Sequence, residues 1–203
     1  MLERRDSLRF EIRQGDTWES GSIRTFRSEI STHEFPPMGA ERWYSVSIFI
    51  PKDFPIENNR LVLAQWWAKT KTQLGEVHRS PILHLRFAEG RLAILLRRYS
   101  EKVVHDDQAF VQTNLYSTRF ELGKWHDFVF HVKWSPDNDG FIQAWNDGEK
   151  IVDFKGSTEN QDEVGPVFKF GLYRDDSPKA YVAYFSDVFT GPTPESVYSN
   201  VRR

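Results

Sequence analysis

The chain has 203 residues and a formal net charge of −2, and it contains no cysteine. The missing cysteine excludes disulfides, thiolate catalysis and cysteine-ligated zinc, and the redox compartment stays open. A balanced charge provides no overall basic field, so we expect no nucleic-acid partner. No stretch approaches the roughly 18 apolar residues of a membrane helix, so we also expect no membrane contact.

The length suits one domain over residues 1–203, and we expect that domain to be a monomer. The first residues, Met1–Asp6, are charged and lack the apolar region of a secretory signal. Two interpretations of the location stay open. Either the protein remains inside the cell, or a signal has been removed and the protein is secreted or periplasmic.

Short segments of alternating apolar and polar residues run along the chain, separated by Gly, Pro, Asn and Asp. This alternation predicts strands. In the first half we expect strands near residues 8–13, 26–33, 43–50, 61–67, 81–87 and 91–97. Residues 100–120 look irregular, with one short strand at 110–114. Later strands are expected near residues 126–134, 141–145, 150–154, 168–175 and 180–189, with one helical turn in the tail.

No long segment has the 3.6-residue period of a helix. Ten or more short strands between turns therefore predict an all-β sandwich. The turn at residues 137–140 gathers oxygen side chains that could hold a structural calcium ion, although it lacks the spacing of an EF-hand. The sequence itself requires no cofactor and predicts no catalytic metal.

The strand at 168–175 carries the first candidate site. One face takes aromatic and aliphatic residues, and the other carries Lys169, Gly171 and Tyr173. A glycine inside a strand often marks the close approach of a ligand or of another backbone. An acidic sugar ring could lie over Gly171, between the cation and the phenol. The alternative is a half-exposed strand whose Lys169 and Tyr173 face water.

Two earlier strands carry matching polar residues. Arg27 and Glu29 share one face, together with His33 if the strand extends that far. The apolar segment 61–67 contains one polar residue, Gln65, on the same face as Trp67. A glutamine inside such a strand must find hydrogen bonds or bind something.

These three strands resemble those of the jelly-roll polysaccharide lyases. The matching segments are Arg27-Ser28-Glu29, Gln65-Trp66-Trp67 and Lys169-Phe170-Gly171-Leu172-Tyr173. The wider sequence, about residues 8–190, is similar to the branch that contains heparin lyase I and glucuronan lyase. The resemblance implies a concanavalin-like jelly roll of two antiparallel sheets with substrate on the concave sheet. One departure is Trp67, which stands where many alginate and heparin lyases have histidine.

The resemblance implies β-elimination on a uronic-acid polymer, with glucuronan preferred. Such a reaction needs charge neutralisation at the carboxylate, a base, and an acid for the leaving oxygen. Arg27 offers a two-donor fork, Gln65 an amide and Lys169 a positive charge. Tyr173 could act as base and then acid, and Glu29 could orient Arg27 or a sugar hydroxyl.

Histidines add a second candidate base. His33 could supply the base or neutraliser that Trp67 cannot, and the glucuronan lyase branch implies a histidine on this strand working with Tyr173. The alternative is an exposed loop histidine. His78 is a weaker candidate in the polar segment 68–79, which could border the substrate, and Trp67 could stack on a sugar.

Two other classes of protein are alternatives to a lyase. A glycoside hydrolase needs two carboxylates about 5 to 10 Å apart, and the E-x-D-x-E strand pattern of jelly-roll glucanases is absent. A non-catalytic carbohydrate-binding module could use the same aromatic face, and the histidine missing at Trp67 keeps that class open. In both the lyase and the binding module, the expected partner is an acidic polysaccharide.

Overall fold

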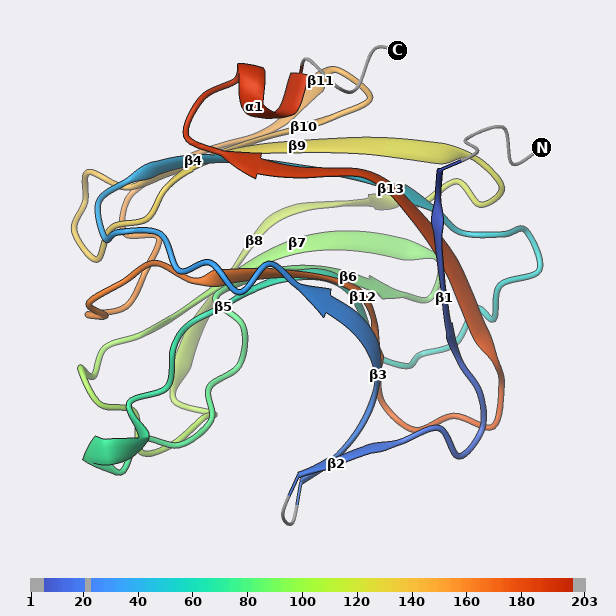
Figure 1. Cartoon of the computed structure of the whole chain (residues 1–203), viewed down its shortest axis with the longest axis horizontal. Helices are drawn as coiled ribbons and strands as arrows, with labels where there is room; N and C mark the ends of the chain where they lie inside the picture. The colour runs from blue at the N-terminus through green and yellow to red at the C-terminus, as the bar shows by residue number, and fades with distance from the viewer. Residues whose placement is uncertain (1–5, 21–22, 199–203) are drawn as a thin grey trace.

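The computed structural model describes residues 6–20 and 23–198, which form two antiparallel sheets packed face to face (Figure 1). The six-stranded sheet runs in the order β1 (Leu8–Ile12), β13 (Tyr181–Gly191), β4 (Glu41–Phe49), β9 (Trp125–Lys133), β10 (Phe141–Asn146) and β11 (Glu149–Lys155). The seven-stranded sheet runs in the order β2 (Trp18–Ser20), β3 (Ile23–Ser31), β12 (Val167–Arg174), β5 (Leu61–Trp67), β6 (Leu83–Ala88), β7 (Arg91–Tyr99) and β8 (Phe110–Arg119).

Helix is confined to two short segments, the 3₁₀ turn η1 (Thr72–Leu74) and α1 (Glu195–Tyr198). The predicted all-β sandwich of two antiparallel sheets is confirmed. The helical turn expected in the tail is confirmed as well. Neither helix is long and apolar enough to cross a membrane, within residues 6–20 and 23–198.

Aromatic side chains from both sheets fill the space between them. Trp66 from β5 packs against Phe168 of β12 and Phe130 of β9, with ring centroids 4.8 Å apart in both pairs. The buried Trp134 donates a hydrogen bond from Nε1 to the Tyr44 hydroxyl at 2.9 Å, so both polar groups are satisfied inside the core. This packing fixes which faces of β5 and β12 point outward.

Two sequence expectations about strand extent were wrong. The segment expected to be mostly irregular forms the ten-residue strand β8, because it pairs with β7 along its whole length. Its many polar residues suit an edge strand exposed to water. The strand carrying Arg27 ends at Ser31 and not at residue 33, and it pairs with β2, a strand that was not expected.

Gly171 lies at an irregularity where the register between β12 and β5 shifts. Its φ of +133° is one that side chains rarely permit, and a Cβ there would lie 2.8 Å from Glu29 Cα and also collide with the Ser28 carbonyl oxygen. Of the two reasons for a strand glycine, the structure shows the close approach of a neighbouring backbone.

The turn considered for calcium has other partners. The Asp139 carboxylate accepts a hydrogen bond from Ser135 Oγ and pairs with Lys133 Nζ, both at 2.6 Å. Across the described ranges, no group of three or more His, Asp or Glu side chains is arranged to hold a metal ion.

Candidate active site

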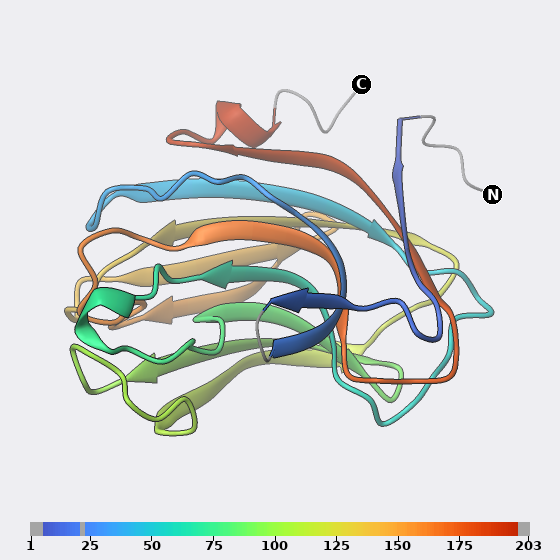
Figure 2. The same cartoon turned by 60° about the horizontal axis from the view of Figure 1, so that its bottom comes forward.

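The outer face of the seven-stranded sheet brings the predicted site strands together. In Figure 1 this sheet is arched, and the η1 loop and β2 project past its outer face; Figure 2 turns this side forward, with β3 in dark blue beside β12 in orange. β12 lies between β3 and β5, and Tyr173 is the register partner of Arg27. Lys169 is the register partner of Gln65. Segments distant in sequence therefore present these four side chains on one surface.

A hydrogen bond crosses β12 above Gly171. Gln65 Nε2 donates to Glu29 Oε1 at 2.5 Å, and the two residues belong to the strands on either side of β12. Burial raises the pKa of Glu29, while the bond from Gln65 and the charges of Lys169 and Arg27 oppose that rise. Glu29 therefore holds the Gln65 amide in place, a partnership that the sequence did not reveal.

Lys169 and Trp67 form a second contact on this surface. Lys169 Nζ lies 4.5 Å from the centroid of the Trp67 ring, and the Trp67 Nε1 donates to the Arg79 carbonyl at 2.8 Å. Burial lowers the pKa of Lys169. The ring of the exposed His78 stacks on the Trp67 ring, with the two centroids 6.0 Å apart. Trp67 thus already has a cation and a histidine as neighbours.

Arginines contact aromatic rings at the other end of the surface. The Arg27 guanidinium lies 3.8 Å from the ring centroid of Trp18, on β2. The Arg60 guanidinium lies 4.8 Å from the Tyr173 ring centroid and is also held by Asp175 Oδ1, 2.6 Å from Nη2. Arg60 had not been recognised in the sequence, because it precedes β5 in a polar loop.

His33 lies just beyond the end of β3. Thr32 still bonds from its N–H to the Phe168 carbonyl at 3.0 Å, but His33 is exposed and has a φ of 58°. Strand alternation therefore does not determine which way its side chain points. The structure leaves His33 beside the start of β12, as a loop residue.

His84 is a buried histidine on the same outer face. It is the register partner of Gln65 on β6 and is only 2% exposed. Burial, together with the positive charges of Arg97, Arg86 and Arg60, lowers its pKa to about 3. His84 is not among the site residues that the sequence predicts.

This depressed pKa predicts an acid-dependent loss of stability. The unfolded chain binds a proton at His84 below its ordinary pKa of 6.5, whereas the folded chain does so only near pH 3. The free energy of unfolding should therefore fall as the pH falls through this window. A His84→Gln variant should lack this component. Its free energy of unfolding, measured by urea titration, should therefore rise relative to that of the wild-type protein as the pH falls. The exposed His105, changed to Gln, is the matched control, and parallel pH curves for all three proteins would contradict the assignment.

The charge of this sheet is strongly one-sided. Across strands β3, β12, β5, β6, β7 and β8, within the bounds described, one carboxylate occurs, that of Glu29. The cations on the same strands are Arg24, Arg27, Arg86, Arg91, Arg97, Arg98, Arg119, Lys169 and Arg174. Of these cations, Arg27, Lys169, Arg86 and Arg97 lie on the outer face with Glu29, and this excess of positive charge favours an anionic ligand.

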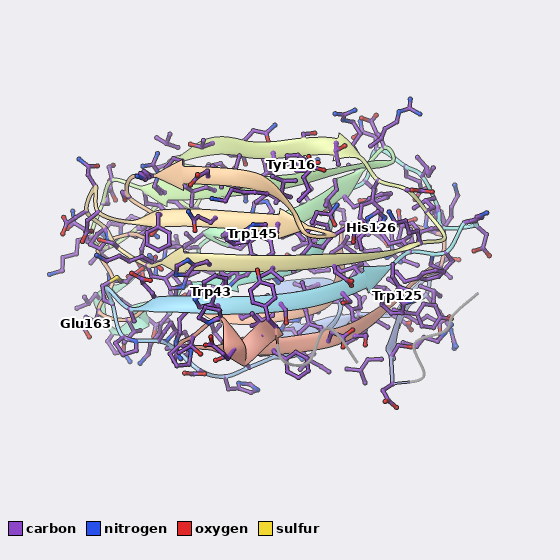
Figure 3. All side chains as sticks on the ribbon, turned by 90° about the horizontal axis from the view of Figure 1, so that it is seen from above. Trp43, Tyr116, Trp125, His126, Trp145 and Glu163 are labelled. Carbon is purple, nitrogen blue, oxygen red and sulfur yellow. The ribbon has the colours of Figure 1, made fainter. Side chains whose placement is uncertain are left out.

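The six-stranded sheet presents a different surface. In Figure 3, Trp43 and Trp145 lie on its outer face, and their ring centroids are 5.9 Å apart in a stacked arrangement. Trp43 also stacks on His131 at 4.1 Å. These ring faces are covered by one another, so they offer no open platform for a sugar. A depression of about 540 Å³ is lined by residues such as Phe49 and Lys52, away from every residue of the candidate site.

A sequence profile described as polysaccharide lyase matches residues 2–189 of the chain. The chain belongs to this polysaccharide lyase family. A search of the curated proteins gives no match. The family resemblance expected from the three strand motifs is thereby confirmed.

Solved structures of lyases share the fold. The endo-β-1,4-glucuronan lyase of the fungus Trichoderma reesei superposes with a TM-score of 0.76 at 19% identity, covering 94% of this chain and 82% of its own. The alginate lyase AlyC3 gives a TM-score of 0.66 at 14% identity, covering 91% of this chain and 74% of its own. The catalytic domain of a glycoside hydrolase family 131 protein from Coprinopsis cinerea gives 0.59 at 16% identity, covering 94% and 72%. At these identities the likeness shows the jelly-roll fold alone.

Proposed function

We propose that this polysaccharide lyase cleaves a uronic-acid polymer by β-elimination, with glucuronan as the preferred substrate. The observation that carries the proposal is the outer face of the seven-stranded sheet, where Tyr173 lies near Arg27, Arg60 and Lys169 and where Glu29 is the one carboxylate that strands β3, β12 and β5 to β8 contribute. The family match supports lyase chemistry, and the likeness to a glucuronan lyase supports the choice of polymer.

In the proposed reaction, a base removes the C5 proton beside the uronate carboxylate, and the bond from C4 to the leaving oxygen breaks. A double bond forms between C4 and C5, and the leaving oxygen takes up a proton. Arg27 and Lys169 bind the carboxylate and stabilise the charge that develops there. Gln65 keeps one amide hydrogen for the substrate, because only the other is needed by Glu29.

Tyr173 is proposed to carry the proton from C5 to the leaving oxygen. The Arg60 guanidinium, 4.8 Å from the Tyr173 ring centroid, places a positive charge beside the residue that is proposed to exchange protons with the substrate. His33 is the alternative base. In that case Tyr173 would still protonate the leaving oxygen.

Two other functions use the same surface. A non-catalytic binding module would hold the polymer without cleaving it. Hydrolysis is the other alternative, because the catalytic domain of a glycoside hydrolase has a similar fold. Hydrolysis by a carboxylate pair is disfavoured, because the described strands β3, β12 and β5 to β8 provide Glu29 alone, and Glu29 is engaged by Gln65.

The test is to incubate the protein with glucuronan, alginate, heparin and a neutral glucan, and to follow ultraviolet absorbance from unsaturated uronate ends. The expected result is a rise with glucuronan that exceeds the rise with the other uronates. Reducing ends without absorbance would indicate hydrolysis. Binding with neither signal would indicate a binding module.

A further inference from the structure

A second group of cations lies on the outer face beyond Gln65. His84 and Arg86 project from β6 on this face, and Arg97 projects from the neighbouring strand β7. The backbone N–H of Arg97 donates a hydrogen bond to the carbonyl of Ile82, which precedes His84 by two residues. His84 therefore lies between the two arginines. Arg86 is the register partner of Val62, which is in turn the partner of Tyr173. Two strand spacings, roughly 10 Å, separate Arg86 from Tyr173.

These arginines have few partners within the protein. Arg97 donates from Nε to the Gln112 amide oxygen at 2.9 Å, and its guanidinium lies 4.4 Å from the Phe110 ring centroid. Asp107 acts on Arg97 through its charge, but its oxygens accept hydrogen bonds from Tyr99 and Ser80.

Arg86 has neither a hydrogen bond nor an ion pair from its side chain to any residue in the described ranges. Its Nε is buried without a partner, and so is Nδ1 of His84. Buried donors and acceptors of this kind normally have a partner, and one that lacks a partner in the protein is often satisfied by a bound group. Two unpartnered polar atoms thus occur side by side on the face where substrate is proposed to lie.

The middle of this group carries no charge. His84 stays neutral at ordinary pH, since its pKa is depressed to about 3. A neutral imidazole can exchange hydrogen bonds with a sugar hydroxyl and adds no repulsion to the neighbouring guanidinium groups.

We propose that Arg86 and Arg97, with His84 between them, form a second anion subsite that binds the carboxylate of another uronate in the same polymer. This inference rests on the substrate class of the proposed function, because it requires a uronate polymer to lie over Tyr173 with the chain running across the strands from β12 toward β7. The subsite would make the protein selective among polysaccharides. The preferred substrate would carry carboxylates on several neighbouring sugars, as a homopolymer of uronic acid does.

The test is calorimetric binding of glucuronate oligomers, from disaccharide to hexasaccharide, to the full chain carrying Tyr173→Phe. Arg86→Gln and Arg97→Gln should each weaken binding of the longer oligomers roughly 10- to 100-fold, the loss expected for one hydrogen bond to a charged group. The loss should grow with oligomer length and be smallest for the disaccharide, the shortest chain and the one least able to contact β6 from β12. Arg97→Lys keeps the charge and should recover part of the affinity, which also checks that the site is folded.

The matched control is Arg91→Gln, an exposed arginine at the far end of β7 that should bind all lengths normally. Equal losses from Arg91→Gln and Arg97→Gln would overturn the subsite in favour of a general charge effect. Unchanged binding at every length would also overturn it. If no polymer is eliminated but the length-dependent loss is observed, the proposed reaction fails while the subsite stands.

Discussion

Tyr173→Phe is expected to lower turnover by roughly 10²- to 10⁴-fold, the effect typical of a lost acid–base group. The change removes only the hydroxyl, so the ring keeps its contact with Arg60 and the fold is retained. Substrate affinity should change little, because Arg27 and Lys169 are still present. Initial rates on the confirmed polymer, measured as a function of substrate concentration, separate the two quantities.

The matched control for this variant is Tyr116→Phe, which removes a hydroxyl from β8, at the edge of the same sheet. It should leave turnover near the wild-type value. His33→Ala distinguishes the two candidate bases, because it should be at least as damaging as Tyr173→Phe if His33 removes the C5 proton. Near-normal turnover for Tyr173→Phe would exclude the tyrosine mechanism while leaving the fold untouched.

Arg79→Ala is expected to reduce the free energy of unfolding by about 3 to 5 kcal/mol, the range for removing one partner of a buried ion pair. The Arg79 side chain is 1% exposed and bonds from Nη1 to Asp162 Oδ2 at 2.8 Å. Glu76 lies 3.6 Å away and accepts the Lys71 and Val104 N–H groups. Without Arg79, buried carboxylates from two loops would lose their shared cation.

Denaturant unfolding of three variants tests this prediction. Arg91→Ala, an exposed change of the same kind, should alter stability by about 0.5 kcal/mol or less. The double variant Arg79→Met with Asp162→Leu should be less destabilised than Arg79→Ala, because it does not leave the Asp162 carboxylate buried without Arg79. Equal losses for Arg79→Ala and Arg91→Ala would show that the buried pair does not hold these loops.

The sandwich could be predicted from the sequence because alternation is a local signal. The segment 61–67 was predicted with the bounds that β5 has, and its apolar residues and Gln65 already implied one buried and one outer face. β8 could not be predicted in full, since its residues are polar on an edge strand and only pairing with β7 extends it. His33 shows the limit of alternation. Because β3 ends at Ser31, the alternation of faces along the strand does not predict the direction of the His33 side chain.

The site was partly readable for a similar reason. Lys169 and Tyr173 lie on one strand, so their common face followed from their spacing. The partnership of Glu29 with Gln65 depends on β12 lying between β3 and β5, and the sequence does not reveal that order. Arg60 was missed because a loop residue beside a strand has no predictable direction. The environment of His84 became clear only when β7 brought Arg97 next to it.

The most direct test of the central claim is to cleave glucuronan in water enriched in heavy oxygen and to weigh the products by mass spectrometry. Elimination breaks the C4–oxygen bond without adding water. The products should therefore carry no heavy oxygen from the cleavage itself, their masses should sum to that of the parent chain, and each new non-reducing end should be unsaturated. Products that gain one water at each cleavage, with the heavy label, would contradict the account.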